Sequence, residues 1–313
     1  MHEVFLIMLV GVPGSGKSTL AKTLSLIYDS AKIFSSDEYR EKLLGSQNNQ
    51  SNNDLIFRTL YKDIAEELHR GYNCILDATN INYKNRKRAL DSIENILRKK
   101  LKNDVVYKKK AIVCCTNISQ CIENDKNRER SVGENVILKF VSRFEYPQYF
   151  EGFDHISSYI GKDSNSITRE DLYTRMSGFN QNSKYHKYDL MTHSMILSEI
   201  YYYRNDRFMS EIAKFHDIGK LVTETKDEEG FSHYYQHANY SAYIIACNPD
   251  IINLYNYDIK SIIFYINQHM HIRDIVKSEK AIKKYKELWG EERFNKLIEF
   301  MNNDNKASGR EYD

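Results

Sequence analysis

The chain has 313 residues, of which 41% are hydrophobic and 28% charged. This globular balance excludes wholesale disorder and makes two domains the starting expectation. The net charge of +2 is too small to indicate a general nucleic-acid coat or a polybasic membrane anchor. The early apolar run of residues 4–10 has no basic flank, whereas a bilayer span needs about 20 residues. We therefore expect a soluble, cytoplasmic protein with no membrane partner.

The first half of the chain alternates apolar strands with amphipathic helices. Predicted strands cover residues 4–10, 32–35, 74–77 and 111–115. One predicted helix begins at Ser18, and another follows the polar residues 48–54, which can cap it. This alternation is the βαβ pattern, which favours a parallel sheet with right-handed crossovers. We expect a doubly wound α/β domain over residues 1–155, with helices on both faces of the sheet.

Helical periodicity dominates beyond about residue 155. Helices are predicted at residues 191–203, 210–215, 241–246, 262–268 and 294–301. We predict an all-helical domain over residues 176–313, joined to the first domain by a polar linker over residues 156–175. Seven of the ten histidines lie between residues 186 and 271. Metal binding is therefore a hypothesis for this half.

Residues 11–18, with the sequence GVPGSGKS, match the phosphate-loop pattern G-x-x-x-x-G-K-[ST] between a predicted strand and a predicted helix. The glycines let backbone N–H groups surround a phosphate, Lys17 can bridge the β- and γ-phosphates, and Ser18 can ligate Mg²⁺. The expected ligand is ATP or another nucleoside triphosphate with Mg²⁺. The predicted binding residues are Gly11, Gly14, Ser15, Gly16, Lys17, Ser18 and Thr19.

Polar residues also follow the next two predicted strands, where the carboxyl edge of the sheet would face the γ-phosphate. Asp37 could take a proton from an acceptor hydroxyl, and it could also cap the helix that follows. Asp77, Thr79 and Asn80 either position substrate or metal, or simply form the turn that ends a strand. A charged segment further along could close over the triphosphate as a lid or lie on the surface, and it carries Arg128 and Arg130.

These residues carry a resemblance. The phosphate loop and the segments 36–40 (SDEYR), 77–80 (DATN) and 127–130 (NRER) resemble the kinase module of bacteriophage-type polynucleotide kinases. The resemblance implies that Asp37 is the general base on a 5′-hydroxyl and that Arg40 holds the 3′ phosphate of the acceptor. It also implies that a lid arginine contacts the donor phosphates, with Arg128 and Arg130 as the candidates.

His216 and Asp217 follow an apolar helical stretch, and an adjacent imidazole and carboxylate at a helix end can both reach one cation. Together with His193 upstream and Asp304 downstream, they resemble the H…HD…D signature of the HD phosphohydrolase superfamily. The resemblance covers residues 176–313. It implies that these four side chains ligate one metal.

Two further histidines, His237 and His269, resemble the extra ligands of two-metal HD enzymes. One or two divalent metals are therefore expected, and the mixed ligand set suits Mn, Fe, Co, Ni or Zn. Two such metals would suit the hydrolysis of phosphomonoesters or phosphodiesters. Lys220 could bind a substrate phosphate or cap the turn that it follows. We interpret His186 and His233 as ordinary hydrogen-bonded or exposed histidines.

A kinase joined to a phosphohydrolase resembles the bacterial HD-type polynucleotide kinases, in which the HD module comes first rather than last. The resemblance predicts an enzyme that heals nucleic-acid ends, mainly of RNA. One site would phosphorylate a 5′-hydroxyl and the other would remove a 2′,3′-cyclic or terminal phosphate, with a separate ligase as a candidate partner. Two alternatives are a small-molecule or nucleoside kinase fused to a nucleotide phosphohydrolase, and a nucleotide-gated sensor with a degenerate HD domain.

Overall fold

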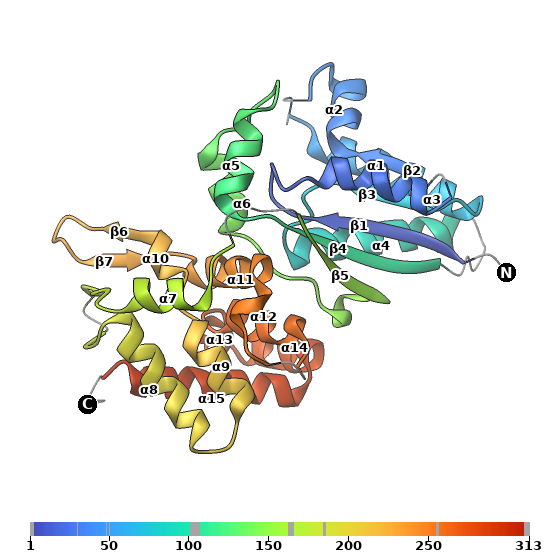
Figure 1. Cartoon of the computed structure of the whole chain (residues 1–313). Coiled ribbons are helices and arrows are strands. Elements are labelled where there is room, and N and C mark those ends of the chain that lie inside the picture. The colour runs from blue at the N-terminus through green and yellow to red at the C-terminus, as the bar shows by residue number, and fades with distance from the viewer. Residues whose placement is uncertain are drawn as a thin grey trace. The chain divides into compact units, whose positions relative to one another are not determined.

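The computed structural model describes residues 3–29, 31–47, 49, 51–100, 107–161, 166–183, 186–254 and 257–309. The chain divides into two compact units (Figure 1). The first unit comprises residues 1–140 and 147–163, and the second comprises residues 141–146 and 164–313.

A five-stranded sheet forms the centre of the first unit, and all of its strand pairs are parallel. The strand order is β2-β3-β1-β4-β5. The strands are β1 (Val4–Val10), β2 (Lys32–Ser35), β3 (Cys74–Asp77), β4 (Tyr107–Cys115) and β5 (His155–Ile160). The apolar β1 is central and buried along nearly its whole length, as expected for a strand covered on both faces. The predicted parallel α/β fold of this half is confirmed.

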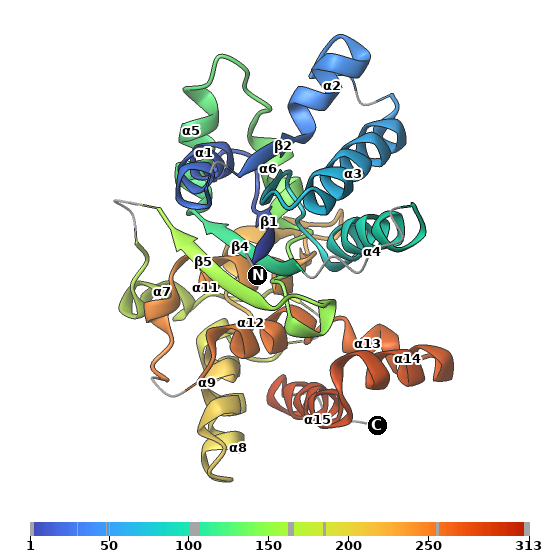
Figure 2. The same ribbon diagram turned by 90° about the vertical axis from the view of Figure 1, so that its right-hand side faces the viewer.

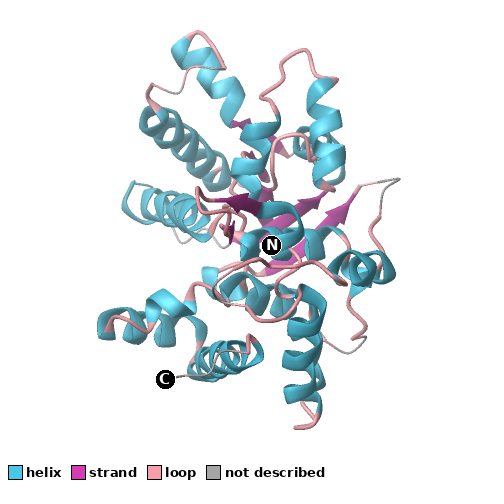
Figure 3. Ribbon diagram, turned by 90° about the vertical axis from the view of Figure 1, so that its left-hand side faces the viewer, coloured by secondary structure: helices cyan, strands magenta, loops and turns pink. Residues whose placement is uncertain are grey.

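Helices flank this sheet on both sides (Figures 2 and 3). On one face, Leu20 and Leu24 of α1 (Lys17–Ile27) pack with Ile7 and Leu9 of β1. On the opposite side lie α3 (Asn53–His69) and α4 (Tyr83–Lys100). The remaining helical elements are α2 (Ser36–Leu44), α5 (Ile118–Lys126), α6 (Glu134–Val141) and η1 (Tyr149–Glu151).

Polar caps and one buried ion pair fix these helices. The Asn52 side chain accepts a 3.1 Å hydrogen bond from the Leu55 N–H at the start of α3, so the predicted polar cap is confirmed. Arg86 of α4 is fully buried and donates to Glu151 of η1 through two bonds of 2.7 and 2.8 Å. A third bond of 3.1 Å reaches the Asn80 carbonyl. Arg86 therefore joins α4, η1 and the turn that follows β3.

The linker predicted at residues 156–175 differs from the structure. Residues 155–160 form β5, which pairs with β4 at the edge of the sheet. Five of its six residues are exposed, so the strand lacks the apolar signal of the other four. The C-terminal part of the predicted linker forms α7 (Arg169–Met176), which Thr168 caps. Between β5 and α7, residues 161 and 166–168 lie outside helices and strands, and residues 162–165 lie outside the described residues.

The second unit is helical, as predicted, except for a short hairpin. Its longer helices are α8 (Leu190–Tyr202), α9 (Arg207–Phe215), α11 (His237–Cys247), α12 (Ile259–Gln268), α14 (Glu279–Trp289) and α15 (Glu291–Ala307). Its short helices are α10 (Lys220–Thr223), α13 (Ile272–Ile275) and η2 (Pro249–Ile251). The antiparallel hairpin pairs β6 (Glu224–Lys226) with β7 (Ser232–Tyr234). Strands of three residues are too short to show alternation.

The core of the second unit is aromatic beneath its histidines. Tyr201 of α8 and Phe300 of α15 stack with ring centroids 5.9 Å apart, and both are almost fully buried. Phe300 also packs edge-on against His216, at 5.4 Å. These aromatic rings shield one side of the histidine group from water. In the part of the chain that the structure describes, no helix has the length and apolar character needed to cross a bilayer.

Candidate active sites

The phosphate loop of the first unit connects β1 to α1 through glycines that no other residue could replace without strain. Gly14 and Gly16 have φ of 80° and 84°, the left-handed region that favours glycine. A Cβ on Gly14 would lie 2.2 Å from the Cys121 carbonyl oxygen. The loop backbone at Gly14 therefore packs directly against the backbone of α5, and a side chain at this position would not fit.

Lys17 is buried at the start of α1. Its ammonium donates a 2.8 Å hydrogen bond to the Val12 carbonyl within the same loop. Burial lowers the pKa of Lys17, the groups Cys114 and Asp77 partly offset this effect, and the positive charge of Arg128 adds to it. The loop thus holds a desolvated cation near a carboxylate at the end of β3 and an arginine that follows α5.

The donor set of this loop fits a phosphate chain with a magnesium ion. The first N–H groups of α1 have no partner within the helix, and the first turn of α1 contains no acidic residue. The Ser15 hydroxyl is buried and has no hydrogen-bond partner among the described residues. Ser18 and Thr19 are exposed, so their hydroxyls are accessible to a ligand.

Asp37 and Arg40 form a pair on α2. The N-cap of α2 is Ser35, so the structure does not assign the capping role to Asp37. The Asp37 carboxylate is 56% exposed and accepts a 2.5 Å hydrogen bond from the Arg40 guanidinium, which is only 14% exposed. The Asp37 carboxylate is therefore accessible to a large acceptor molecule, and the mostly buried Arg40 guanidinium lies beside it.

The segment that ends β3 supports the phosphate loop. The Gly11 N–H donates a 3.0 Å hydrogen bond to the Thr79 carbonyl. Asn80 has a positive φ of 45°, is buried, and donates through its side-chain amide to the Leu9 carbonyl at 2.8 Å. These contacts favour the turn interpretation for Thr79 and Asn80. The buried Asp77 carboxylate is the member of this group whose charge acts on Lys17.

Asp125 organises the segment that follows α5. One of its carboxylate oxygens accepts a hydroxyl at 2.6 Å and two backbone N–H groups at 2.9 Å, all from residues 131–133. Arg128 lies 3.7 Å from the other oxygen and is 43% exposed. Arg130 donates instead to the Gln47 side chain at 2.6 Å. Arg128, whose charge acts on the phosphate loop, is thus the better placed of the two lid candidates.

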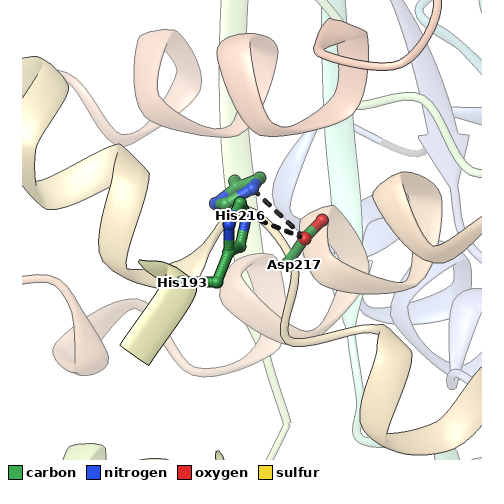
Figure 4. A group of neighbouring side chains, drawn as sticks. All are labelled: His193, His216 and Asp217. Carbon is green, nitrogen blue, oxygen red and sulfur yellow. Dashed lines mark ion pairs between the residues drawn. The ribbon is translucent and has the colours of Figure 1, made fainter. Parts of the chain in front are cut away.

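In the second unit, four predicted ligands from three separate parts of the chain meet. His193 comes from α8, His216 and Asp217 follow α9, and Asp304 comes from α15. The Nε2 atom of His193 lies 3.1 Å from Asp304 and 3.6 Å from Asp217, and that of His216 lies 3.4 and 3.3 Å from the same two carboxylates. Figure 4 shows the two imidazoles converging on Asp217. All four residues are buried.

A second group shares the same aspartate. The Nε2 atoms of His237, at the start of α11, and His269, just after α12, lie 3.0 and 3.4 Å from Oδ1 of Asp217. The first group faces the other oxygen, Oδ2, of that carboxylate. His193, His216 and Asp217 could hold one cation, and Asp217, His237 and His269 another. Asp217 therefore lies between two candidate ion positions.

Backbone contacts orient these imidazoles inward. The Nδ1 atoms of His216, His237 and His269 lie 2.7 to 2.8 Å from carbonyl oxygens three residues earlier in the chain. A ring that donates from Nδ1 presents the lone pair of Nε2, and metal-ligating histidines are commonly held in this way. The Nε2 atoms of His193 and His216 are buried without a well-aligned hydrogen-bond partner among the described residues. These donor atoms fit divalent cations.

The electrostatics of the group favour a cation. Burial opposes protonation of His216, but Asp217 and Asp304 outweigh it and raise the pKa of His216 to about 10. Burial would raise the pKa of Asp217, yet His216, Lys220 and His237 hold that pKa well below its usual range. The pKa of His269 is lowered to about 4, chiefly by burial. The negative charges of Asp217 and Asp304, which favour the protonated form of His216, would also attract a divalent metal ion.

Two cations border this group. The buried Lys220 ammonium lies 2.6 Å from Asp217 and donates to the Gln181 side chain at 2.7 Å. Arg273 donates to the outer oxygen of Asp304 at 2.6 Å, which leaves the inner oxygen facing the histidines. Both cations line a cavity of about 300 Å³ that also reaches Asp217 and Asp304. Lys220 thus faces the cavity rather than only capping a turn.

Sequence reasoning missed several residues of this site. Arg273 and Gln181 carry no motif, and His186, interpreted as an ordinary histidine, lines the cavity with its Nε2 3.1 Å from Lys220. Burial and Lys220 lower the pKa of His186 to about 3. The crowding of histidines between residues 186 and 271 was the available signal for it. His271, by contrast, is exposed and contacts Gln268.

Comparisons with known proteins address mainly the first unit. A family model described as an AAA domain matches residues 6–147. Similar solved structures include a kinase candidate from Chloroflexus aurantiacus (18% identity, 51% of this chain, 86% of that chain, TM-score 0.40). Another is a fungal RNA kinase (18% identity, 53% of this chain, 79% of that chain, TM-score 0.39). A third is a chain of the Pnkp1/Rnl/Hen1 RNA repair complex (20% identity, 46% of this chain, 44% of that chain, TM-score 0.36). No curated protein matches this chain.

The family match spans the phosphate loop, the carboxyl ends of β2 and β3, and the segment after α5. The first unit has the parallel α/β P-loop fold. The chain spans 44% of the repair-complex protein that it resembles. The matched residues end at 147, so a function for the second unit has to be inferred from the geometry of its own side chains.

Proposed function

We propose that this protein is a bifunctional enzyme that heals nucleic-acid ends, with RNA as its main substrate. The first unit would phosphorylate a 5′-hydroxyl with ATP, and the second would remove a 2′,3′-cyclic or terminal phosphate with divalent metal ions. The observation that carries the proposal is the Asp217 carboxylate shared by two buried imidazole pairs, in a chain whose other unit holds a complete phosphate loop.

For the kinase, the loop and Lys17 would hold the triphosphate, and Ser18 would ligate its Mg²⁺. Asp37 would accept the proton of the attacking hydroxyl. Arg40 now occupies that carboxylate at 2.5 Å. An acceptor whose phosphate binds Arg40 would draw the guanidinium away and leave Asp37 able to accept the proton. Arg128 would neutralise charge that develops on the transferred phosphoryl group.

For the hydrolase, His193, His216, Asp217 and Asp304 would hold one ion, and Asp217, His237 and His269 the other. Such ions, when bound, polarise a phosphoryl oxygen and lower the pKa of water. Lys220 and Arg273 would bind the remaining phosphate oxygens from the cavity wall. Arg273 also orients Asp304 through their 2.6 Å hydrogen bond.

The two proposed activities act on the two ends of one break, because cleavage that leaves a 5′-hydroxyl also leaves a 2′,3′-cyclic phosphate. The exposed Asp37 carboxylate suits the end of a polymer better than a small enclosed acceptor. A separate ligase would then be expected to seal the products. The alternative, a small-molecule or nucleoside kinase joined to a nucleotide phosphohydrolase, uses the same two sites.

One substrate tests both halves. An RNA with a 5′-hydroxyl and a 2′,3′-cyclic phosphate is incubated with ATP, Mg²⁺ and Mn²⁺, and both termini are analysed. We expect a 5′-phosphate and loss of the cyclic phosphate. Lys17→Ala should abolish only the first change and His216→Ala only the second. Phosphorylation of a nucleoside or sugar but not of the RNA end would support the alternative instead.

A further inference from the structure

The β6–β7 hairpin and the residue after it place an aromatic pair at the rim of the cavity that holds Asp217. The His233 and Tyr235 rings are stacked, with centroids 5.6 Å apart and planes within 5° of parallel. Both residues line the cavity. Tyr235 is 69% exposed, so most of its surface remains accessible to a ligand. This pair plays no part in the metal group described above.

The His233 side of this pair is held in place. The Nε2 atom of His233 lies 2.8 Å from the Asp227 carboxylate. The other oxygen of Asp227 accepts the N–H groups of Glu229 and Phe231 at 3.0 and 2.9 Å, which folds the tip of the hairpin. The His233 ring therefore has a fixed position under the exposed Tyr235 ring.

The hairpin is also tied to the cation that borders the metal group. The Tyr234 hydroxyl, between the two stacked residues in sequence, donates to the Gln181 carbonyl at 2.7 Å. The side chain of the same Gln181 accepts a 2.7 Å hydrogen bond from Lys220. The aromatic rim and the phosphate-binding Lys220 are thus fixed to one residue, and a single ligand could contact both.

A ligand that uses both features must carry a charged phosphate group and, beside it, a flat aromatic face. A nucleotide has this chemistry, whereas a sugar phosphate or a simple phosphate ester would leave the exposed ring unused. The cavity of about 300 Å³ is at the small end for ligand sites. It suits a terminal nucleotide rather than a duplex.

We propose that His233 and Tyr235 form a stacking platform for the base of the terminal nucleotide whose phosphate lies at Lys220 and the metal group. The inference depends on the proposed hydrolase function and specifies its substrate. Every base has a π face, so stacking of this kind tolerates any sequence. We expect little preference among the four bases.

The test uses Tyr235→Ala, Tyr235→Phe and the control Tyr203→Ala. Tyr203 is 80% exposed at the end of α8 and is not among the described residues that line the cavity. Binding is followed by the fluorescence of 2-aminopurine ribonucleoside 3′-monophosphate, which stacking quenches. Hydrolysis is compared between adenosine 2′,3′-cyclic phosphate and ribose 2′,3′-cyclic phosphate, which lacks a base. Circular dichroism and metal content establish that each variant is folded and loaded.

Stacking on one aromatic ring predicts that Tyr235→Ala raises the Kd of the 2-aminopurine nucleotide and the KM of the adenosine ester roughly tenfold. The quenching should be lost, while kcat and the KM of the ribose ester stay within about twofold. Tyr235→Phe should resemble the wild type, because it keeps the ring. The control variant should be unchanged in every measurement.

Equal effects of Tyr235→Ala on the two esters, or no effect on either, would overturn the platform while leaving the hydrolase in place. The failure of the proposed function is distinguishable. If the wild type hydrolyses neither ester, the hydrolase is wrong. Quenching that still depended on Tyr235 would then support the platform as a nucleotide-binding site alone.

Discussion

Substitution of Gly219 tests whether the close packing of its backbone against α11 positions His237 in the second candidate metal group, which comprises Asp217, His237 and His269. Gly219 lies two residues after Asp217, and its N–H donates a 2.8 Å hydrogen bond to the Ser241 hydroxyl of α11. A Cβ at this position would lie 2.1 Å from the carbonyl oxygen of His237 and 2.8 Å from the Ser241 nitrogen. Both are backbone atoms, so α10 and α11 would have to separate.

The required movement is about 1 Å, because unbonded carbon and oxygen atoms approach to roughly 3.3 Å at closest. Ligand distances in metal sites are held to about 0.2 Å. Such a shift would carry His237, now 3.0 Å from Asp217, out of coordinating range. Gly219→Ala should therefore lose the metal proposed at His237 and His269 and keep the metal proposed near His193. Overpacking of this kind should also destabilise the fold by about 1–3 kcal/mol.

The assay is metal stoichiometry after dialysis, measured together with unfolding in urea. Gly178→Ala is the matched control, because Gly178 has φ of 72° and open space around its Cβ position. It should lose about 1 kcal/mol through backbone strain and keep both metals. If Gly219→Ala bound as much metal as the wild type, the close approach would not set the geometry of the site.

Three other predictions concern separate parts of the chain. Asp37→Asn should reduce 5′-kinase activity at least about 100-fold, because the general base is lost. Cyclic-phosphate hydrolysis by the same preparation should be unchanged. Equal loss of both activities would argue against independent sites. Glu151→Gln should cost about 3–5 kcal/mol in urea unfolding, because it leaves the buried Arg86 without its charged partner; a loss below 1 kcal/mol would contradict this reading. Burial opposes ionisation of Glu211, but hydrogen bonds from groups including Arg169 lower its pKa below the ordinary value of 4.5. The stability from Glu211 is therefore present above pH 4.5 and lost as the pH falls through the lower folded-state pKa, so urea unfolding from pH 7 to pH 3 should show a smaller acid-dependent loss for Glu211→Gln than for the wild type.

The sheet was predictable where its strands are buried on both faces. The central strand β1 reads as a continuous apolar run, and the P-loop pattern marks its end. The edge strand β5 could not be recognised, because five of its six residues are exposed. The β6–β7 hairpin was missed because three residues are too few for a period to appear.

The predicted metal group consists of side chains that the fold brings together from distant positions. The motif indicated four of these residues: His193, His216, Asp217 and Asp304. In the structure, the Nε2 atom of each histidine lies within 3.6 Å of a carboxylate oxygen of each aspartate. Arg273 could not be predicted, because its role depends on how α13 and α15 pack rather than on any local pattern. Sequence patterns report chemistry that recurs at fixed spacing, and tertiary neighbours such as Arg273 leave no such trace.

The proposed hydrolase requires two divalent cations in the second unit, one on either side of the Asp217 carboxylate. Anomalous diffraction from crystals soaked in Mn²⁺ tests it directly. We predict two peaks, one beside His193, His216 and Asp304 and the other beside His237 and His269. Both peaks should disappear in Asp217→Asn. An empty group at saturating Mn²⁺, or peaks that survive this substitution, would contradict two cations bridged by Asp217.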